Sequence, residues 1–215
     1  MNMRDSIETL LTSEERRLMD SLKTPYLVQS FLDDVEYPSS GENRSCLEVM
    51  RQRKAHCLDG GLFAAMALQR IGFAPRIIDL QPDPGRDDDH VLALFRIDGC
   101  WGAVAKSNYS GLRFREAIYR TTRDLALSYF EDFFNLLGEK SLRTASRVIP
   151  LSRFDHLNWM LDSSGVDEIE KYLKQVKTHP LITPAQIARL SPVDERSFNA
   201  GSLGTNIDGA FKPKG

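Results

Sequence analysis

The chain has 215 residues, of which 41% are hydrophobic and 27% charged, as in globular proteins with a substantial core. A formal net charge of −2 provides no electrostatic attraction to nucleic acid or to an anionic membrane, and we expect neither as a partner. No apolar run reaches the roughly 18 residues of a membrane span. Because the first residues include acids and three cysteines cannot all pair, we expect a cytoplasmic protein with reduced thiols.

Residues 1–44 are predicted to form a helical extension at the periphery of the fold. Thr12 precedes two acids and Thr24 precedes a proline, so each is a candidate N-cap. A loop rich in Pro, Ser and Gly follows at 37–41, and Ser45 can cap a short helix over 46–53. We expect this part of the chain to be scaffold without chemistry.

The stretch 55–70, AHCLDGGLFAAMALQR, is predicted to be a central buried helix. Its Ala, Leu and Met residues favour a helix, and apolar residues on nearly every side indicate that protein surrounds it. Cys57 stands at the first turn, where free backbone N–H groups and the positive end of the helix dipole lower the pKa of a thiol. The position therefore favours Cys57 as a nucleophile.

The pattern after this helix changes to that of strands. A strand is expected over 76–80, an acidic loop over 81–89, and a hairpin with strands at 90–97 and 100–105 joined by Asp98 and Gly99. A helix followed by such a hairpin predicts an α+β fold with the helix packed on an antiparallel sheet. Helices are also expected over 123–135, 166–176 and 184–190. The stretch 136–162 is expected to form a loop with strand or short helix.

We expect a single domain over 1–190, with a catalytic-type core at 45–135. The tail, 191–215, is rich in Gly, Asn, Ser and Pro, which indicates that it is either extended and flexible or draped over the body.

A cysteine nucleophile needs a base and a group that orients the base. His90 opens a strand directly after the acidic loop, so its ring can stand at the sheet edge nearest the first turn of the central helix. Asn108 follows the returning strand, and its amide can accept a hydrogen bond from the imidazole. Ser107 and Asp98 are weaker candidates for this third position. The other histidines are interpreted as structural: His56, His156 and His179.

Three segments together, HCLDGGLFAAMALQRIGFAPRIIDL, DHVLALF and GCWGAVAKSN, resemble the transglutaminase-like superfamily over 45–109. The resemblance implies a papain-like core in which a Cys57 thiolate and a His90 imidazolium act on acyl carbonyls. The superfamily usually places an aspartate on the strand after the histidine. Since 101–105 holds no carboxylate, Asn108 is the proposed substitute. For the oxyanion, the resemblance implies the backbone N–H of Cys57 and an upstream side chain, for which Gln52 is the nearest amide.

Two functions of different class follow from this pattern. The first is a cysteine hydrolase or acyltransferase that uses Cys57, His90 and Asn108 on a peptide, amide or other acyl substrate, without a cofactor. The alternative is a catalytically inactive module that keeps the fold and binds a partner. Asp87, Asp88 and Asp89 lack the spacing of paired metal ligands, so we expect a solvated loop and no metal site. Cys46 and Cys100 are interpreted as buried thiols, and the arginines of 113–123 as a solvated face.

Overall fold

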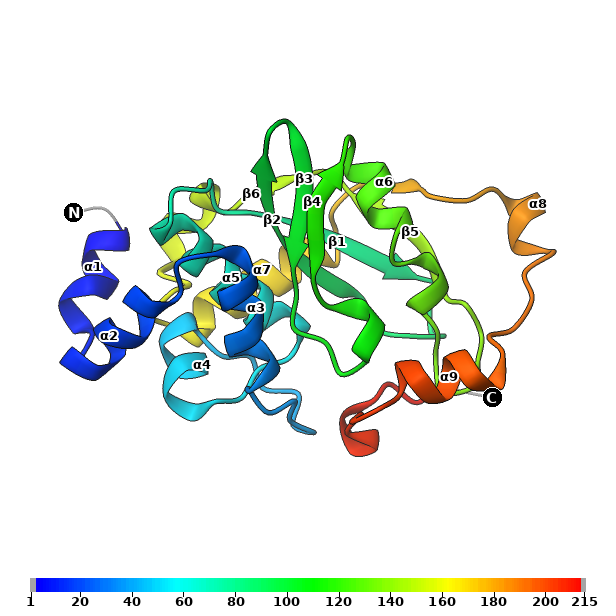
Figure 1. Cartoon of the computed structure of the whole chain (residues 1–215), viewed down its shortest axis with the longest axis horizontal. Coiled ribbons are helices and arrows are strands. Elements are labelled where there is room, and N and C mark those ends of the chain that lie inside the picture. Colours follow the sequence, from blue (N-terminus) through cyan, green and yellow to red (C-terminus); the bar gives the residue numbers. More distant parts are fainter. Residues whose placement is uncertain (1–2, 214–215) are drawn as a thin grey trace.

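One antiparallel sheet organises the chain (Figure 1). The computed structural model describes residues 3–213, in which seven strands form this sheet in the order β4-β3-β2-β1-β5-β7, with β6 also paired to β1. The strands are β1 (Arg76–Pro82), β2 (His90–Ile97), β3 (Cys100–Val104), β4 (Arg115–Tyr119), β5 (Leu142–Ser146), β6 (Ile149–Pro150) and β7 (Thr178–Pro180). Asp98 and Gly99, with φ of 48° and 81°, form the predicted turn between β2 and β3.

Helices surround this sheet. They are α1 (Met3–Leu10), α2 (Ser13–Ser21), α3 (Pro25–Asp33), α4 (Cys46–Gln52), α5 (Cys57–Arg70), α6 (Thr122–Leu127), α7 (Ser163–Leu173), α8 (Pro184–Ile187) and α9 (Glu195–Gly201). Thr12, Thr24 and Ser45 are the N-caps of α2, α3 and α4, as predicted. Within residues 3–213, no helix combines the length and apolarity that crossing a bilayer requires.

The two faces of the sheet carry different layers (Figure 1). One face packs against α5, with α3, α4 and α7 around it, and Leu62, Phe63 and Leu68 of α5 are fully buried there. The other face is covered by α6 and the aromatic turn after it, where Tyr129 and Phe133 are buried. The predicted α+β arrangement, a buried helix on an antiparallel sheet, is confirmed at this level.

Two glycines let the first turns of α5 touch the sheet directly. A Cβ added at Gly60 would lie 2.2 Å from Cβ of Lys106, and one added at Gly61 would lie 2.9 Å from Cγ1 of Val91. Carbon atoms normally pack at about 3.5–4.0 Å, so only glycine fits at Gly60 without a shift of the chain. This close approach brings the N-terminal end of α5 beside the start of β2.

The prediction that 1–44 is peripheral is wrong for α3. Val28 and Leu32 are fully buried, and Phe31 stacks on Phe63 of α5 with ring centroids 4.7 Å apart. The amide of Gln29 donates to the carbonyl of Ala105 and accepts from its N–H, both at 3.1 Å. The sequence pattern showed an apolar stripe on this helix but not that the stripe faces α5 and β3.

The helix expected over 123–135 is also wrong in extent. It ends at Leu127, where the hydroxyl of Ser128 donates to the carbonyl of Leu125 at 2.6 Å and competes with the helical bonds. A 3-10 turn follows at Phe130–Asp132, and β4 occupies residues for which no strand was expected. The tail forms α9, and the segment after it continues along the body, as the draped alternative predicted.

Candidate active site

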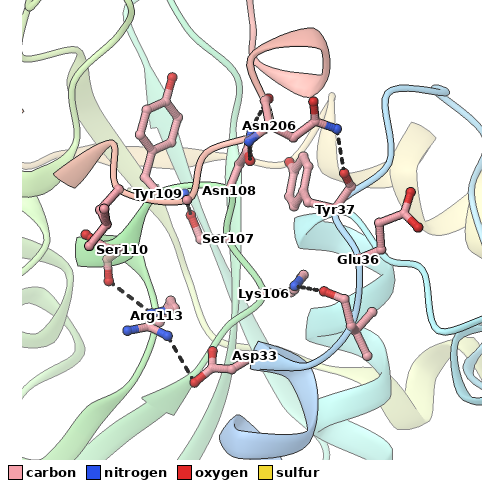
Figure 2. A pocket seen from close by; sticks show the side chains of 13 residues that line it. Asp33, Glu36, Tyr37, Lys106, Ser107, Asn108, Tyr109, Ser110, Arg113 and Asn206 are labelled. Atoms are coloured by element: carbon pink, nitrogen blue, oxygen red, sulfur yellow. Dashed lines mark hydrogen bonds and ion pairs between the residues drawn. The ribbon is translucent and has the colours of Figure 1, made fainter. Parts of the chain in front are cut away.

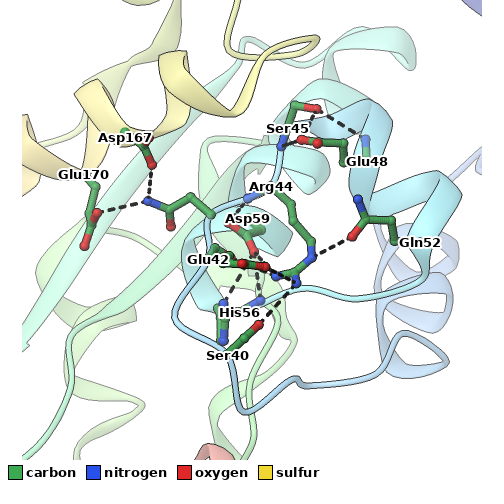
Figure 3. Close-up of polar contacts among 11 residues, drawn as sticks. Ser40, Glu42, Arg44, Ser45, Glu48, Gln52, His56, Asp59, Asp167 and Glu170 are labelled. Atoms are coloured by element: carbon green, nitrogen blue, oxygen red, sulfur yellow. Dashed lines mark hydrogen bonds and ion pairs between the residues drawn. The ribbon is translucent and has the colours of Figure 1, made fainter.

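Cys57 is the first residue of α5, and His56 is the N-cap. The carboxylate of Asp59, fully buried in this first turn, accepts hydrogen bonds from the N–H of His56 at 3.2 Å and from the N–H of Arg44 at 3.0 Å (Figure 3). The amide of Asn43 links the same loop to Asp167 and Glu170 of α7. These contacts fix the helix N-terminus and the loop in front of it as one unit.

His90 is the first residue of β2 and is only 3% exposed. Its Nε2 lies 2.7 Å from the carbonyl oxygen of Leu112. Because a carbonyl only accepts hydrogen bonds, Nε2 must carry the proton and Nδ1 is left as the acceptor. The rings of Tyr129 and Phe133, each with its centroid 6.3 Å away, pack edgewise against the imidazole.

The structure brings Cys57 and His90 to one cavity. Both line a small cavity of about 40 Å³, which has room for no more than a few water molecules. The thiol itself is directed at the backbone carbonyl of Asp89, with a sulfur–oxygen distance of 3.6 Å. The sulfur therefore lies beside the residue that precedes His90, and its hydrogen bond goes to that carbonyl.

Asn108 lines the same cavity but does not orient His90. Its Nδ2 donates to the carbonyl of Asn206 and its Oδ1 accepts from the N–H of Asn206, both at 2.8 Å (Figure 2). The carbonyl of Leu112 takes the place expected of the Asn108 amide, because the chain after β3 returns across the ring of His90. Ser107 accepts from the N–H of Tyr109 at 2.9 Å.

Gln52, the residue considered as a second oxyanion donor, is exposed on α4. Its Oε1 accepts a hydrogen bond from Nε of Arg44 at 3.0 Å. That contact engages Gln52 in the network around the loop before α5 (Figure 3).

The pKa directions differ from those that a helix N-terminus alone predicts. Burial raises the pKa of the Cys57 thiol well above its ordinary value, and the carboxylates of Asp89 and Asp88 raise it further. Burial also lowers the pKa of His90 to about 4. The expected lowering of the thiol pKa is therefore wrong, because desolvation and the nearby carboxylates raise it. The resting pair at neutral pH is a thiol and a neutral imidazole.

The acidic loop before His90 is not simply solvated. Asp87 and Asp89 are half-buried, and the hydroxyl of Ser141 donates to Oδ2 of Asp87 at 2.5 Å. Burial raises the pKa of Asp87 to about 6. Burial and the neighbouring Asp88 carboxylate raise the pKa of Asp89. Among the residues that the structure describes, no three His, Cys, Asp or Glu side chains are grouped so as to hold a metal ion.

Two larger cavities share lining residues with the small one. Cys57 also lines an outer groove of about 290 Å³, together with His56 and Asp88. A third cavity of about 620 Å³ is lined by Asn108 and Asn206, whose contact Figure 2 shows. These two volumes approach or fall within the range of small-molecule sites, whereas the cavity shared by Cys57 and His90 is far smaller.

Tyr37 is a site residue that the sequence reasoning missed. It lines all three cavities, and its ring packs edgewise on His56 with centroids 5.3 Å apart. Burial raises the pKa of its phenol well above the ordinary value, and the charge of a Cys57 thiolate acts in the same direction. The phenol therefore stays protonated as a hydrogen-bond donor. A tyrosine in a Pro/Ser/Gly loop carried no signal of this placement.

No protein-family model matches the chain, and a search of curated proteins finds no significant match. The transglutaminase-like resemblance rests on the residues of this chain alone. Function must therefore be argued from the site.

Proposed function

We propose that this chain is a cysteine-dependent hydrolase or acyltransferase with a transglutaminase-like, papain-like core, in which Cys57 is the nucleophile and His90 the base. One observation carries the proposal. A thiol at the start of a buried helix and an imidazole with a free acceptor nitrogen at the start of the adjacent strand open onto one cavity. This is the nucleophile–base pairing that acyl transfer requires.

The reaction needs one proton transfer before attack. The thiol leaves the Asp89 carbonyl by rotation between staggered positions about its Cα–Cβ bond, and its proton moves to Nδ1 of His90. The sulfur then attacks the acyl carbon and forms a C–S bond. The C–N or C–O bond of the substrate breaks, and the leaving group takes the proton from His90. Water or an amine then cleaves the thioester and restores the thiol.

The oxyanion of the tetrahedral intermediate needs donors placed before the reaction. The backbone N–H of Cys57 belongs to the first turn of α5, whose amides have no acceptor within the helix. The protonated hydroxyl of Tyr37, on the same cavities, is the proposed second donor.

A binding module without catalysis is the second candidate function. The pKa shifts of Cys57 and His90 both favour uncharged groups, and the cavity that they share has room for only a few water molecules. These observations suit a site that only holds a partner. The module predicts that neither residue reacts in a way that depends on the other.

Acylation measured by intact-protein mass spectrometry tests the proposal. With a panel of p-nitrophenyl esters and peptide amides, we expect an acyl adduct on Cys57 that hydroxylamine removes and that Cys57→Ala lacks. His90→Gln should slow acylation at least roughly 100-fold, whereas His156→Gln, a histidine control at an exposed position outside these cavities, should stay near the parent rate. An adduct on another residue, or a Cys57 adduct that forms equally fast without His90, would refute the mechanism. Absence of any adduct would favour the binding module.

A further inference from the structure

The C-terminal segment 204–211 forms a wall shared by all three cavities at the site. Gly204 and Asn206 line the largest cavity, and Gly209, Ala210 and Phe211 line both cavities beside Cys57. Figure 1 shows this part of the chain, in red, returning along the body after α9. A single stretch of peptide therefore lines all three cavities, two of which contain Cys57.

The contact that holds the segment recognises peptide backbone. The amide of Asn108 pairs with both the N–H and the carbonyl of Asn206, each at 2.8 Å (Figure 2). A side-chain amide bonded in this way reads the main chain of a residue, whatever its side chain is. Asn206 Nδ2 also donates to the carbonyl of Tyr37 at 2.9 Å, and Thr205 donates to the carbonyl of Asn108 at 3.0 Å.

A second feature restricts which peptide fits. A Cβ added at Gly209 would lie 2.7 Å from the carbonyl oxygen of Pro38, closer than folded proteins allow. Gly209 comes three residues after the residue that Asn108 holds, and it lies at the cavities that contain Cys57. The groove therefore requires glycine at this position, next to the nucleophile.

We propose that the groove along Asn108, Tyr37 and Cys57 is a binding site for a peptide that forms a short 3-10 turn with glycine at this position, as Ile207–Gly209 does, and that segment 204–211 occupies the groove in cis as a competitor. This inference rests on the proposed function of Cys57, whose substrate class and regulation it names. The small cavity of about 40 Å³ is then a resting state. When the segment leaves, that cavity joins its larger neighbours, and Cys57, which is partly buried in the resting state, becomes more accessible.

The test measures the alkylation rate of Cys57 by iodoacetamide in the full-length chain, with peptide mass spectrometry to separate the three thiols. Gly209→Ala and Asn206→Ala, which loosen the segment, should each raise the rate at least tenfold. Asn199→Ala, an exposed asparagine on α9, is the matched control and should leave the rate unchanged. The peptide GTNIDGAFKP, added to Gly209→Ala, should lower the rate again with saturation. GTNIDVAFKP, with valine at the critical position, should not.

Parent-like rates in both loosened variants would overturn the inference, as would equal protection by the two peptides. Each measurement is repeated with His90→Gln. An acceleration by Gly209→Ala that persists in that background supports the competing segment even if His90 is no base. A His90-dependent rate that Gly209→Ala leaves unaltered would instead retain the proposed function and reject the competitor.

Discussion

Replacing Gly60 with alanine tests whether the close contact between α5 and the chain after β3 positions Cys57. The new methyl group would lie 2.2 Å from Cβ of Lys106, so α5 and the chain after β3 must separate by roughly 1.5 Å to reach normal carbon contact. Overpacking of this kind destabilises a core by about 1–3 kcal/mol. Alanine favours a helix over glycine by about 1 kcal/mol, which offsets part of the destabilisation from overpacking. We expect a net loss of up to about 2 kcal/mol in the free energy of unfolding.

Gly61→Ala provides a graded comparison, because its methyl group would lie 2.9 Å from Val91 Cγ1 and needs a smaller shift. Gly41→Ala, with nothing within 4 Å of the added atom, is the neutral control. Urea denaturation should rank the stabilities as Gly41→Ala above Gly61→Ala above Gly60→Ala. Acylation of Cys57 in Gly60→Ala should fall about 100-fold, since displacements near 1 Å disrupt reactive geometry. Parent-like stability and acylation in Gly60→Ala would show that this contact does not set the position of Cys57.

Three further predictions concern single side chains. Tyr37→Phe keeps the ring but removes the hydroxyl, so acylation of Cys57 should fall about 100-fold with unchanged stability; an unchanged acylation rate would exclude Tyr37 as an oxyanion donor. The folded pKa of Asp87, about 6, exceeds the unfolded value of about 4, so the folded state binds the extra proton and stability falls as pH rises between them. Asp87→Asn should remove this contribution to the pH dependence of stability, measured as the urea midpoint between pH 4 and 6. The same pH dependence in Asp87→Asn and the parent chain would contradict the raised pKa of Asp87. Phe63→Ala removes a fully buried ring and should lower the free energy of unfolding by about 3–5 kcal/mol. Ile118→Ala, at an exposed side chain, should change it by less than about 0.5 kcal/mol, and similar losses in the two variants would contradict the burial of Phe63 in the core.

The elements closest to the site were predictable from sequence because their signals are local. A nearly uncharged run with an Ala-rich composition marks α5, and the Asp98–Gly99 turn between two apolar runs marks the β2–β3 hairpin. These two signals were enough to expect Cys57 and His90 at neighbouring ends of a helix and a strand, and both line one cavity.

The remaining features depend on contacts between distant parts of the chain. The partner of His90 is a backbone carbonyl, that of Leu112, and a carbonyl leaves no mark on residue type. Asn108 has a side chain able to orient an imidazole, but it pairs with Asn206, 98 residues away. The raised pKa of Cys57 likewise follows from burial and from acids of another loop, which a reading of the helix alone omits.

The pH dependence of Cys57 alkylation tests the central claim, that Cys57 and His90 share a proton, most directly. Between the lowered pKa of His90 and the raised pKa of the thiol, the thiolate–imidazolium form has the same proton count as the neutral pair. The fraction of this form does not change with pH, so it adds a constant component to the alkylation rate. The account therefore predicts that the rate levels off toward pH 5 in the parent chain and in the control His156→Gln, whose side chain is exposed. In His90→Gln the rate should instead rise about tenfold per pH unit, as for an isolated thiol. A tenfold rise per unit in all three proteins would contradict the pairing of these two residues.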